Sequence, residues 1–120
     1  MAKQKKVYFL KSCNTCMRII KDLSIGDEFE YQNIKEKPIT KQQVDEMKAL
    51  TGSYEALFSR RAMKYRSMGL NEVDLKEKDY RKYITEEYTF LKRPVFIVDD
   101  EIFVGNAKKV VEQLKAKLKN

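Results

Sequence analysis

The positions of the apolar residues divide the start of the chain into a strand, a helix and a second strand. Residues 7–10 form a short apolar run that predicts a buried strand. Apolar side chains then recur at helical spacing, at Cys16, Ile19, Ile20 and Leu23. Residues 29–32 alternate apolar and polar, as a half-buried strand does. This β-α-β opening favours two parallel strands joined by a right-handed crossover.

A second helix is predicted to begin near Lys41. Thr40 and Gln43 have the spacing of a capping box, and Ile39 with Val44 has the spacing of a hydrophobic staple. The pattern predicts a buried stripe that comprises Val44, Met47 and Leu50, and a helix end near Gly52.

Residues 53–91 carry large apolar side chains at irregular intervals, which favours short helices over strands. We expect Gly69 to end one of them and a further helix over residues 79–91, with Tyr80, Tyr83 and Ile84 on one side. The number of large apolar residues argues against a disordered basic arm. Together with the preceding helix, this region forms a predicted helical insertion over about residues 40–91.

The end of the chain predicts a hairpin followed by a helix. Residues 95–98 and 102–105 are β-rich runs on either side of an acidic turn, Asp99-Asp100-Glu101. An amphipathic C-terminal helix is marked by Ala107, Val110, Val111, Leu114 and Leu118. The fold class is therefore α/β, with a mixed sheet in the order βαβ…ββα. The length of 120 residues favours a single domain over residues 1–120.

The composition excludes several kinds of site. The sequence has no histidine, which rules out Ser-His-Asp and Cys-His catalysis and every zinc site that uses histidine. Its two cysteines cannot close a structural zinc centre by themselves. Asp or Glu ligands or a second chain would have to complete such a site, and neither has a spacing signature here. We therefore expect no bound metal.

The net charge of +7 arises from lysines and arginines that are interleaved with acidic residues. This distribution favours a solvated surface over direct nucleic-acid binding, and only Arg60, Arg61, Lys64 and Arg66 cluster. No run is as apolar as the core of a signal peptide or a membrane helix. We expect a cytoplasmic protein that does not enter a membrane.

The only two cysteines, Cys13 and Cys16, lie where the first strand gives way to the first helix. Free N–H groups and the macrodipole at a helix N-terminus favour an anion, so a thiol there loses its proton more easily. Cys13, just outside the helix, is the predicted thiolate. A close cysteine pair in the reducing cytoplasm is more often catalytic or redox-sensing than structural.

A strand, a Cys-x-x-Cys motif that opens a helix, and a proline that precedes a hairpin together resemble the thioredoxin and glutaredoxin fold. Pro94 occupies the place of the cis-proline of that fold, whereas Pro38 is better explained as a residue before a helix. With its helical insertion the whole chain resembles the arsenate reductase family that includes the ArsC proteins and the Spx regulators. The segments that carry this resemblance are residues 13–16, 57–66 with Gly69-Leu70, 91–94 and 103–105.

The resemblance implies a role for each of several residues. Cys13 matches the nucleophilic cysteine of the family, and Arg93 matches the arginine before the cis-proline, here Pro94. Arg61 matches the mid-chain arginine, with Arg60 as the competitor one position away. A guanidinium group stays charged and offers bidentate hydrogen bonds to an oxyanion, so Arg61 and Arg93 are candidate substrate-binding residues.

Two positions depart from the family pattern. The reductases of the family resemble one another in having no cysteine three positions after the nucleophile, where this chain has Cys16. Cys16 can act as a resolving thiol that closes an internal disulfide with Cys13. An external reductant, thioredoxin or glutathione with glutaredoxin, would then reduce this disulfide without any bound cofactor. Asn106 stands where the reductases tend to carry a further arginine, so the substrate is expected to be an oxyanion or a disulfide rather than arsenate specifically.

Two alternatives to a thiol-disulfide oxidoreductase stay open. In one, the chain is an Spx-like regulator whose cysteine pair is a redox switch and whose partner is RNA polymerase. The sequence stops near Asn120, without the longer C-terminal extension that such regulators tend to have. In the other, the fold is retained as a structural domain and the cysteines have no chemistry.

Overall fold

The computed structural model describes residues 4–119 of the chain. The chain folds as two compact units: Met1–Lys37 with Arg93–Asn120 form the first, and Pro38–Lys92 form the second. The second unit contains the predicted helical insertion. The single domain expected for residues 1–120 stays a prediction.

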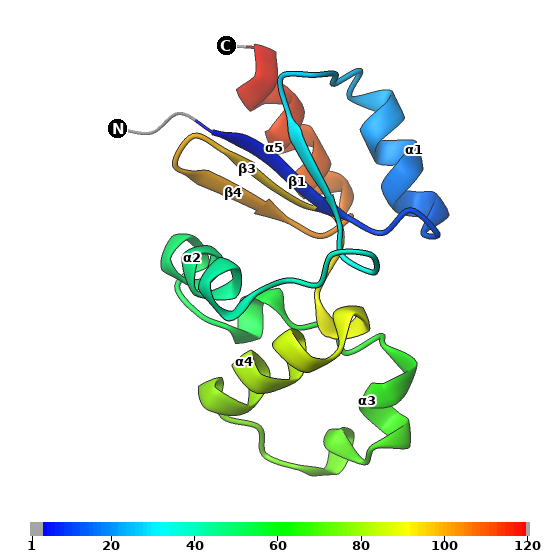
Figure 1. The fold of residues 1–120 in the computed structure, drawn as a ribbon, viewed down its shortest axis with the longest axis vertical. Coiled ribbons are helices and arrows are strands. Elements are labelled where there is room, and N and C mark those ends of the chain that lie inside the picture. Colours follow the sequence, from blue (N-terminus) through cyan, green and yellow to red (C-terminus); the bar gives the residue numbers. More distant parts are fainter. Residues whose placement is uncertain (1–3, 120) are drawn as a thin grey trace. The chain divides into compact units, whose positions relative to one another are not determined.

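The first unit is built on a four-stranded mixed sheet (Figure 1). Its strands are β1 (Lys5–Phe9), β2 (Glu30–Asn33), β3 (Val95–Val98) and β4 (Glu101–Val104), in the order β2-β1-β3-β4. Strand β1 pairs with β2 in parallel and with β3 antiparallel, so that Val7 lies opposite Tyr31 on one side and Phe96 on the other. The structure thus confirms the predicted βαβ unit, the hairpin and the α/β fold class.

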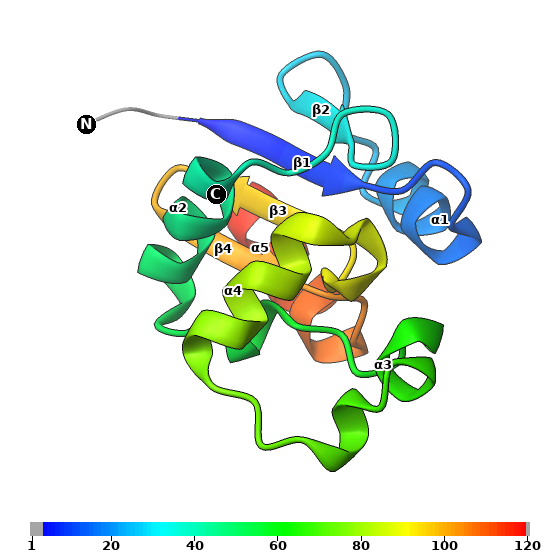
Figure 2. The ribbon, with the colours of Figure 1, turned by 60° about the horizontal axis from the view of Figure 1, so that its bottom comes forward.

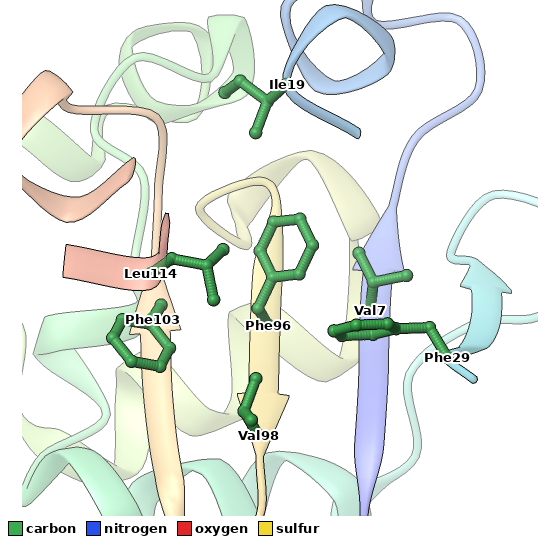
Figure 3. Packing of buried hydrophobic residues seen from close by; sticks show 7 residues of the cluster. All are labelled: Val7, Ile19, Phe29, Phe96, Val98, Phe103 and Leu114. Atoms are coloured by element: carbon green, nitrogen blue, oxygen red, sulfur yellow. The ribbon is translucent and has the colours of Figure 1, made fainter. Parts of the chain in front are cut away.

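Two helices cover one face of this sheet. Helix α1 (Asn14–Asp22) connects β1 to β2, and α5 (Lys108–Lys119) follows β4. Figure 3 shows Ile19 of α1 and Leu114 of α5 over the side chains of the strands. The buried cluster comprises Val7, Ile19, Phe29, Phe96, Val98, Phe103 and Leu114. All four residues of β3 are buried, as expected for a strand with neighbours on both sides.

The alternation over residues 29–32 mispredicts which side chains of β2 are buried. Phe29 precedes the strand, Tyr31 is 41% exposed and Gln32 is 3% exposed. Gln32 tolerates burial because its side-chain amide donates to the Lys37 carbonyl at 3.0 Å. Tyr31 packs edge-on against Phe9, and its hydroxyl donates to the Gly26 carbonyl at 3.1 Å.

The regular elements of the second unit are all helices (Figure 2). Its α-helices are α2 (Lys41–Thr51), α3 (Met63–Ser67) and α4 (Glu77–Glu86), and its 3-10 helices are η1 (Glu55–Leu57), η2 (Leu70–Glu72) and η3 (Tyr88–Phe90). The capping box of Thr40 and Gln43 is present as predicted, and Gly52 and Gly69 adopt left-handed conformations after α2 and α3. Within residues 4–119 no helix is long and apolar enough to cross a membrane.

Two predictions in this unit are wrong in detail. Leu50 is 36% exposed, because six residues of α-helix rotate by roughly 600° and so place Leu50 about 120° away from Val44. The helix predicted over residues 79–91 begins at Glu77 and ends at Glu86. The chain then extends at Glu87, whose carboxylate accepts the Thr89 N–H and starts the separate turn η3.

One ion pair connects α2 to α4 in the second unit, and a hydrogen bond from a third segment reinforces it. The Arg81 guanidinium of α4 donates to both carboxylate oxygens of Asp45 in α2, at 2.8 and 3.0 Å. The Tyr54 hydroxyl, just before η1, donates to the same carboxylate at 2.7 Å. These bonds hold the pKa of Asp45 at about 2, with Arg81 as the main cause and Tyr54 as the next.

Candidate functional site

Cys13 stands at the point where β1 passes into α1. Its N–H donates to the Leu10 carbonyl at 2.9 Å, which closes the turn after the strand. Its backbone is extended, and its carbonyl accepts the Met17 N–H at 3.1 Å, which makes Cys13 the N-cap residue of α1. The half-buried side chain therefore lies just outside the helix, as the sequence predicts.

The surroundings of Cys13 favour its thiolate. Partial burial is the one effect that disfavours the thiolate, because desolvation raises the pKa of a thiol. The backbone N–H of Cys16, the thiol of Cys16, the charge of Arg93 and the N–H of Thr15 outweigh burial and lower the pKa of Cys13. The sulfur makes no regular capping hydrogen bond, yet these groups face it closely enough to stabilise its negative charge.

The pKa of Cys16 is raised, whereas that of Cys13 is lowered. Cys16 is fully buried on α1, and its pKa is raised to about 12, with burial as the main cause. The neighbouring Cys13 sulfur contributes to this rise, by a hydrogen bond and by its charge. The Leu10 backbone and Arg93 act the other way without offsetting burial. Cys13 is thus the more acidic thiol of the pair, and Cys16 is the one that keeps its proton.

Arg93 and Pro94 are distant from the cysteines in the sequence, but Arg93 lies close to them in the fold. The peptide bond between them is cis, as the resemblance implies, and Pro94 leads directly into β3. The half-buried Arg93 lies near enough for its charge to lower the pKa of both cysteines. The Pro94 carbonyl accepts the Gly105 N–H at 2.9 Å, which fastens this segment to the end of β4.

The sequence analysis includes Gly105 only within a segment that carries the family resemblance, and it does not single out the backbone N–H groups of this site. Gly105 has a φ of 91°, a left-handed conformation that glycine adopts without strain. In the sequence, this conformation is indicated only by the position of the glycine, directly after the second strand of a hairpin. The particular N–H groups that face the Cys13 sulfur, those of Thr15 and Cys16, follow only from the position of the helix start.

The mid-chain arginines belong to the second unit. Arg60 is engaged there: its guanidinium lies 2.7 Å from the Glu55 carboxylate and 3.0 Å from the Tyr80 hydroxyl. Arg61 is exposed, and among residues 4–119 its side chain has no hydrogen bond or ion pair. Arg61 is therefore the arginine of the two that is available to a ligand, and its role stays a prediction.

One comparison with known proteins identifies a family. The sequence profile of the ArsC family matches residues 8–114. No match was found among curated protein sequences.

Several solved structures share the fold. An arsenate reductase from Vibrio cholerae is 13% identical, with a TM-score of 0.72 and coverage of 94% of this chain and 96% of that one. An arsenate reductase (ArsC) related protein from Brucella melitensis is 18% identical, with a TM-score of 0.69 and coverage of 100% of this chain and 98% of that one. A protein from Staphylococcus aureus COL is 22% identical, with a TM-score of 0.71 and coverage of 92% of this chain and 97% of that one.

Proposed function

The chain belongs to the ArsC family, and we propose that it is a thiol-dependent oxidoreductase in which Cys13 attacks the substrate and Cys16 resolves the product. One observation carries the proposal: the thiol at the start of α1 has a lowered pKa beside a protonated second thiol and a guanidinium group. A thiolate is the nucleophilic form of cysteine, and a nearby second thiol can break a covalent adduct by forming a disulfide.

The reaction proceeds in two steps. The Cys13 thiolate attacks one sulfur of a disulfide and releases the other as a thiolate, or attacks the central atom of an oxyanion and displaces one oxygen as water after it gains two protons. Cys16 then loses its proton and attacks the Cys13 sulfur. The disulfide between the cysteines forms, the bond from Cys13 to the substrate breaks, and its electron pair stays on the substrate, which is reduced by two electrons.

The environment of Cys16 supports this order of events. Burial raises its pKa first, and the charge and hydrogen bond of Cys13 add to that effect. Once Cys13 is bonded to a substrate, its negative charge is gone, so the pKa of Cys16 falls. Cys16 is therefore inactive while Cys13 is a free thiolate and becomes more acidic when an adduct needs to be resolved.

The remaining roles follow from charge. Arg93 would bind an oxyanion through bidentate hydrogen bonds, and Arg61 stays the second candidate that the family resemblance implies. The reductant that reopens the disulfide would be thioredoxin, or glutathione with glutaredoxin, and the site needs no bound cofactor. The expected compartment is the cytoplasm.

Turnover assays test the proposal. The protein would be supplied with arsenate or with hydroxyethyl disulfide, together with thioredoxin, thioredoxin reductase and NADPH, or with glutathione, glutaredoxin, glutathione reductase and NADPH. We expect NADPH oxidation that depends on the protein, its loss in Cys13→Ser, and a trapped adduct on Cys13 in Cys16→Ser by intact mass. If the cysteines form a disulfide on oxidation but no substrate is turned over, the proposal fails in favour of the redox-sensing regulator with RNA polymerase as its partner.

A further inference from the structure

We propose that the second unit binds a small polyphosphate anion between α2 and α4, through residues that have no part in the thiol chemistry. These two helices lie side by side in both views of the molecule (Figures 1 and 2). A hollow of about 420 Å³ opens between them, which is within the range of small-molecule sites. Its lining consists of Ile39, Lys41, Lys78, Arg81, Lys82, Thr85 and Glu86.

The charge of this hollow is positive and is not balanced from within. Arg81 is neutralised by its bidentate pair with Asp45, so the remaining charges are the positive ones of Lys41, Lys78 and Lys82 and the negative one of Glu86. Among residues 4–119 none of these lysines forms an ion pair, and Glu86 forms none either. The Lys82 ammonium lies 5.7 Å from the centre of the Tyr83 ring, a contact that leaves its charge uncompensated.

Local helix energetics oppose the placement of these lysines. Lys41 is the first residue of α2, at the positive end of the helix dipole, and the first turn has no acidic residue to offset it. Lys78 and Lys82 are four residues apart on α4, where like charges repel. An anion in the hollow removes both repulsions at once. Two such features that meet at one cavity support a binding site there.

The lining identifies the class of ligand. Lysine ammonium groups act as flexible point charges that suit phosphate groups, and three of them match a chain of two or three phosphates. Ile39 is the only apolar residue of the lining, and no aromatic ring is among the described residues that line it. A nucleobase would thus find no stacking partner, so the phosphate chain itself is the ligand.

Titration calorimetry with sodium tripolyphosphate at low ionic strength tests this site. We expect binding by the full chain, with affinity that falls as salt is added. Lys78→Gln with Lys82→Gln should weaken binding about tenfold, because two of the three uncompensated charges are lost. Glu86→Gln should tighten it. Glutamine is a good helix former, so circular dichroism should show an unchanged fold.

The matched control is Lys21→Gln with Lys115→Gln, which removes two exposed lysines of the first unit and lowers the net charge equally. It should leave the affinity for tripolyphosphate nearly unchanged. The proposal is overturned by equal weakening in this control, by an absence of binding at low salt, or by much tighter binding of ATP or of an acidic peptide than of tripolyphosphate. Equal affinities for ATP, GTP and tripolyphosphate support it.

Discussion

At the scale of single residues, two thiols separated by two positions acquire opposite acid–base behaviour. Cys16 is fully buried and keeps its proton, whereas Cys13 is half-buried and faces N–H groups and the charge of Arg93. The difference arises because a helix start offers its N–H groups to the cap residue and buries the third residue of the first turn. The same short motif therefore supplies both a nucleophile and a protected second thiol.

The contribution of Arg93 to this asymmetry can be measured. Arg93→Ala should raise the pKa of Cys13, because the substitution removes a positive charge that stabilises the thiolate. At a pH below the new pKa, alkylation of Cys13 by iodoacetamide should become several-fold slower. The measurement is the alkylation rate against pH in a Cys16→Ser background, so that only one thiol is followed.

Two further substitutions complete this experiment. Arg93→Lys should restore most of the pKa but not the bidentate binding of an oxyanion. Lys92→Ala removes a neighbouring exposed charge that is not among the groups acting on Cys13, and it should leave the alkylation profile unchanged. Equal changes in Lys92→Ala and Arg93→Ala would mean that Arg93 acts only through the net charge.

At the scale of elements, the features that the sequence predicts are those with a local cause. The capping box of Thr40 and the left-handed turn at Gly52 involve neighbours in the sequence, so the residues alone indicate them. Gln32 is buried because its amide reaches the Lys37 carbonyl in the following turn, and Leu50 is exposed because of helix rotation. Simple spacing captures neither effect. The approach of Arg93 to Cys13 joins distant segments, and only the family resemblance indicated it.

The ion pair between α2 and α4 gives an element-scale prediction about pH. Asp45 has a folded pKa of about 2, below the roughly 3.9 of an unfolded chain, so its contribution to stability is present above the unfolded pKa and is lost as pH falls through the folded one. Asp45→Asn should therefore lower the free energy of unfolding at pH 7. The gap to the wild type should shrink as pH falls from about 4 to about 2.

Urea unfolding at several pH values between 2 and 7 measures this gap. The control is Glu46→Gln, because Glu46 is an exposed neighbour that forms no ion pair within residues 4–119. Its effect on the free energy of unfolding should be small throughout the range. A gap for Asp45→Asn that stays constant down to pH 2 would show that the carboxylate charge is not what holds α2 to α4.

At the scale of the whole molecule, the question is whether the two units unfold as one domain. The second unit is shorter than about 60 residues, a size at which a separate core is marginal. The expectation of a single domain then predicts one cooperative transition for the whole chain. Because the buried Cys16 belongs to the first unit, its accessibility to a thiol reagent reports the unfolding of that unit alone.

This arrangement allows a test across the units. In a Cys13→Ser background, Ile84→Ala removes a fully buried side chain of the second unit and should cost about 2–5 kcal/mol. If the chain is one domain, labelling of Cys16 in urea should begin at a lower concentration in this variant, just as it should for Leu114→Ala within the first unit. Met63→Ala is the control, because Met63 is 90% exposed and its truncation leaves no cavity. Labelling of Cys16 that responds to Leu114→Ala but not to Ile84→Ala would mean that the helical unit unfolds independently, since a cavity in one cooperative core destabilises every part of it equally.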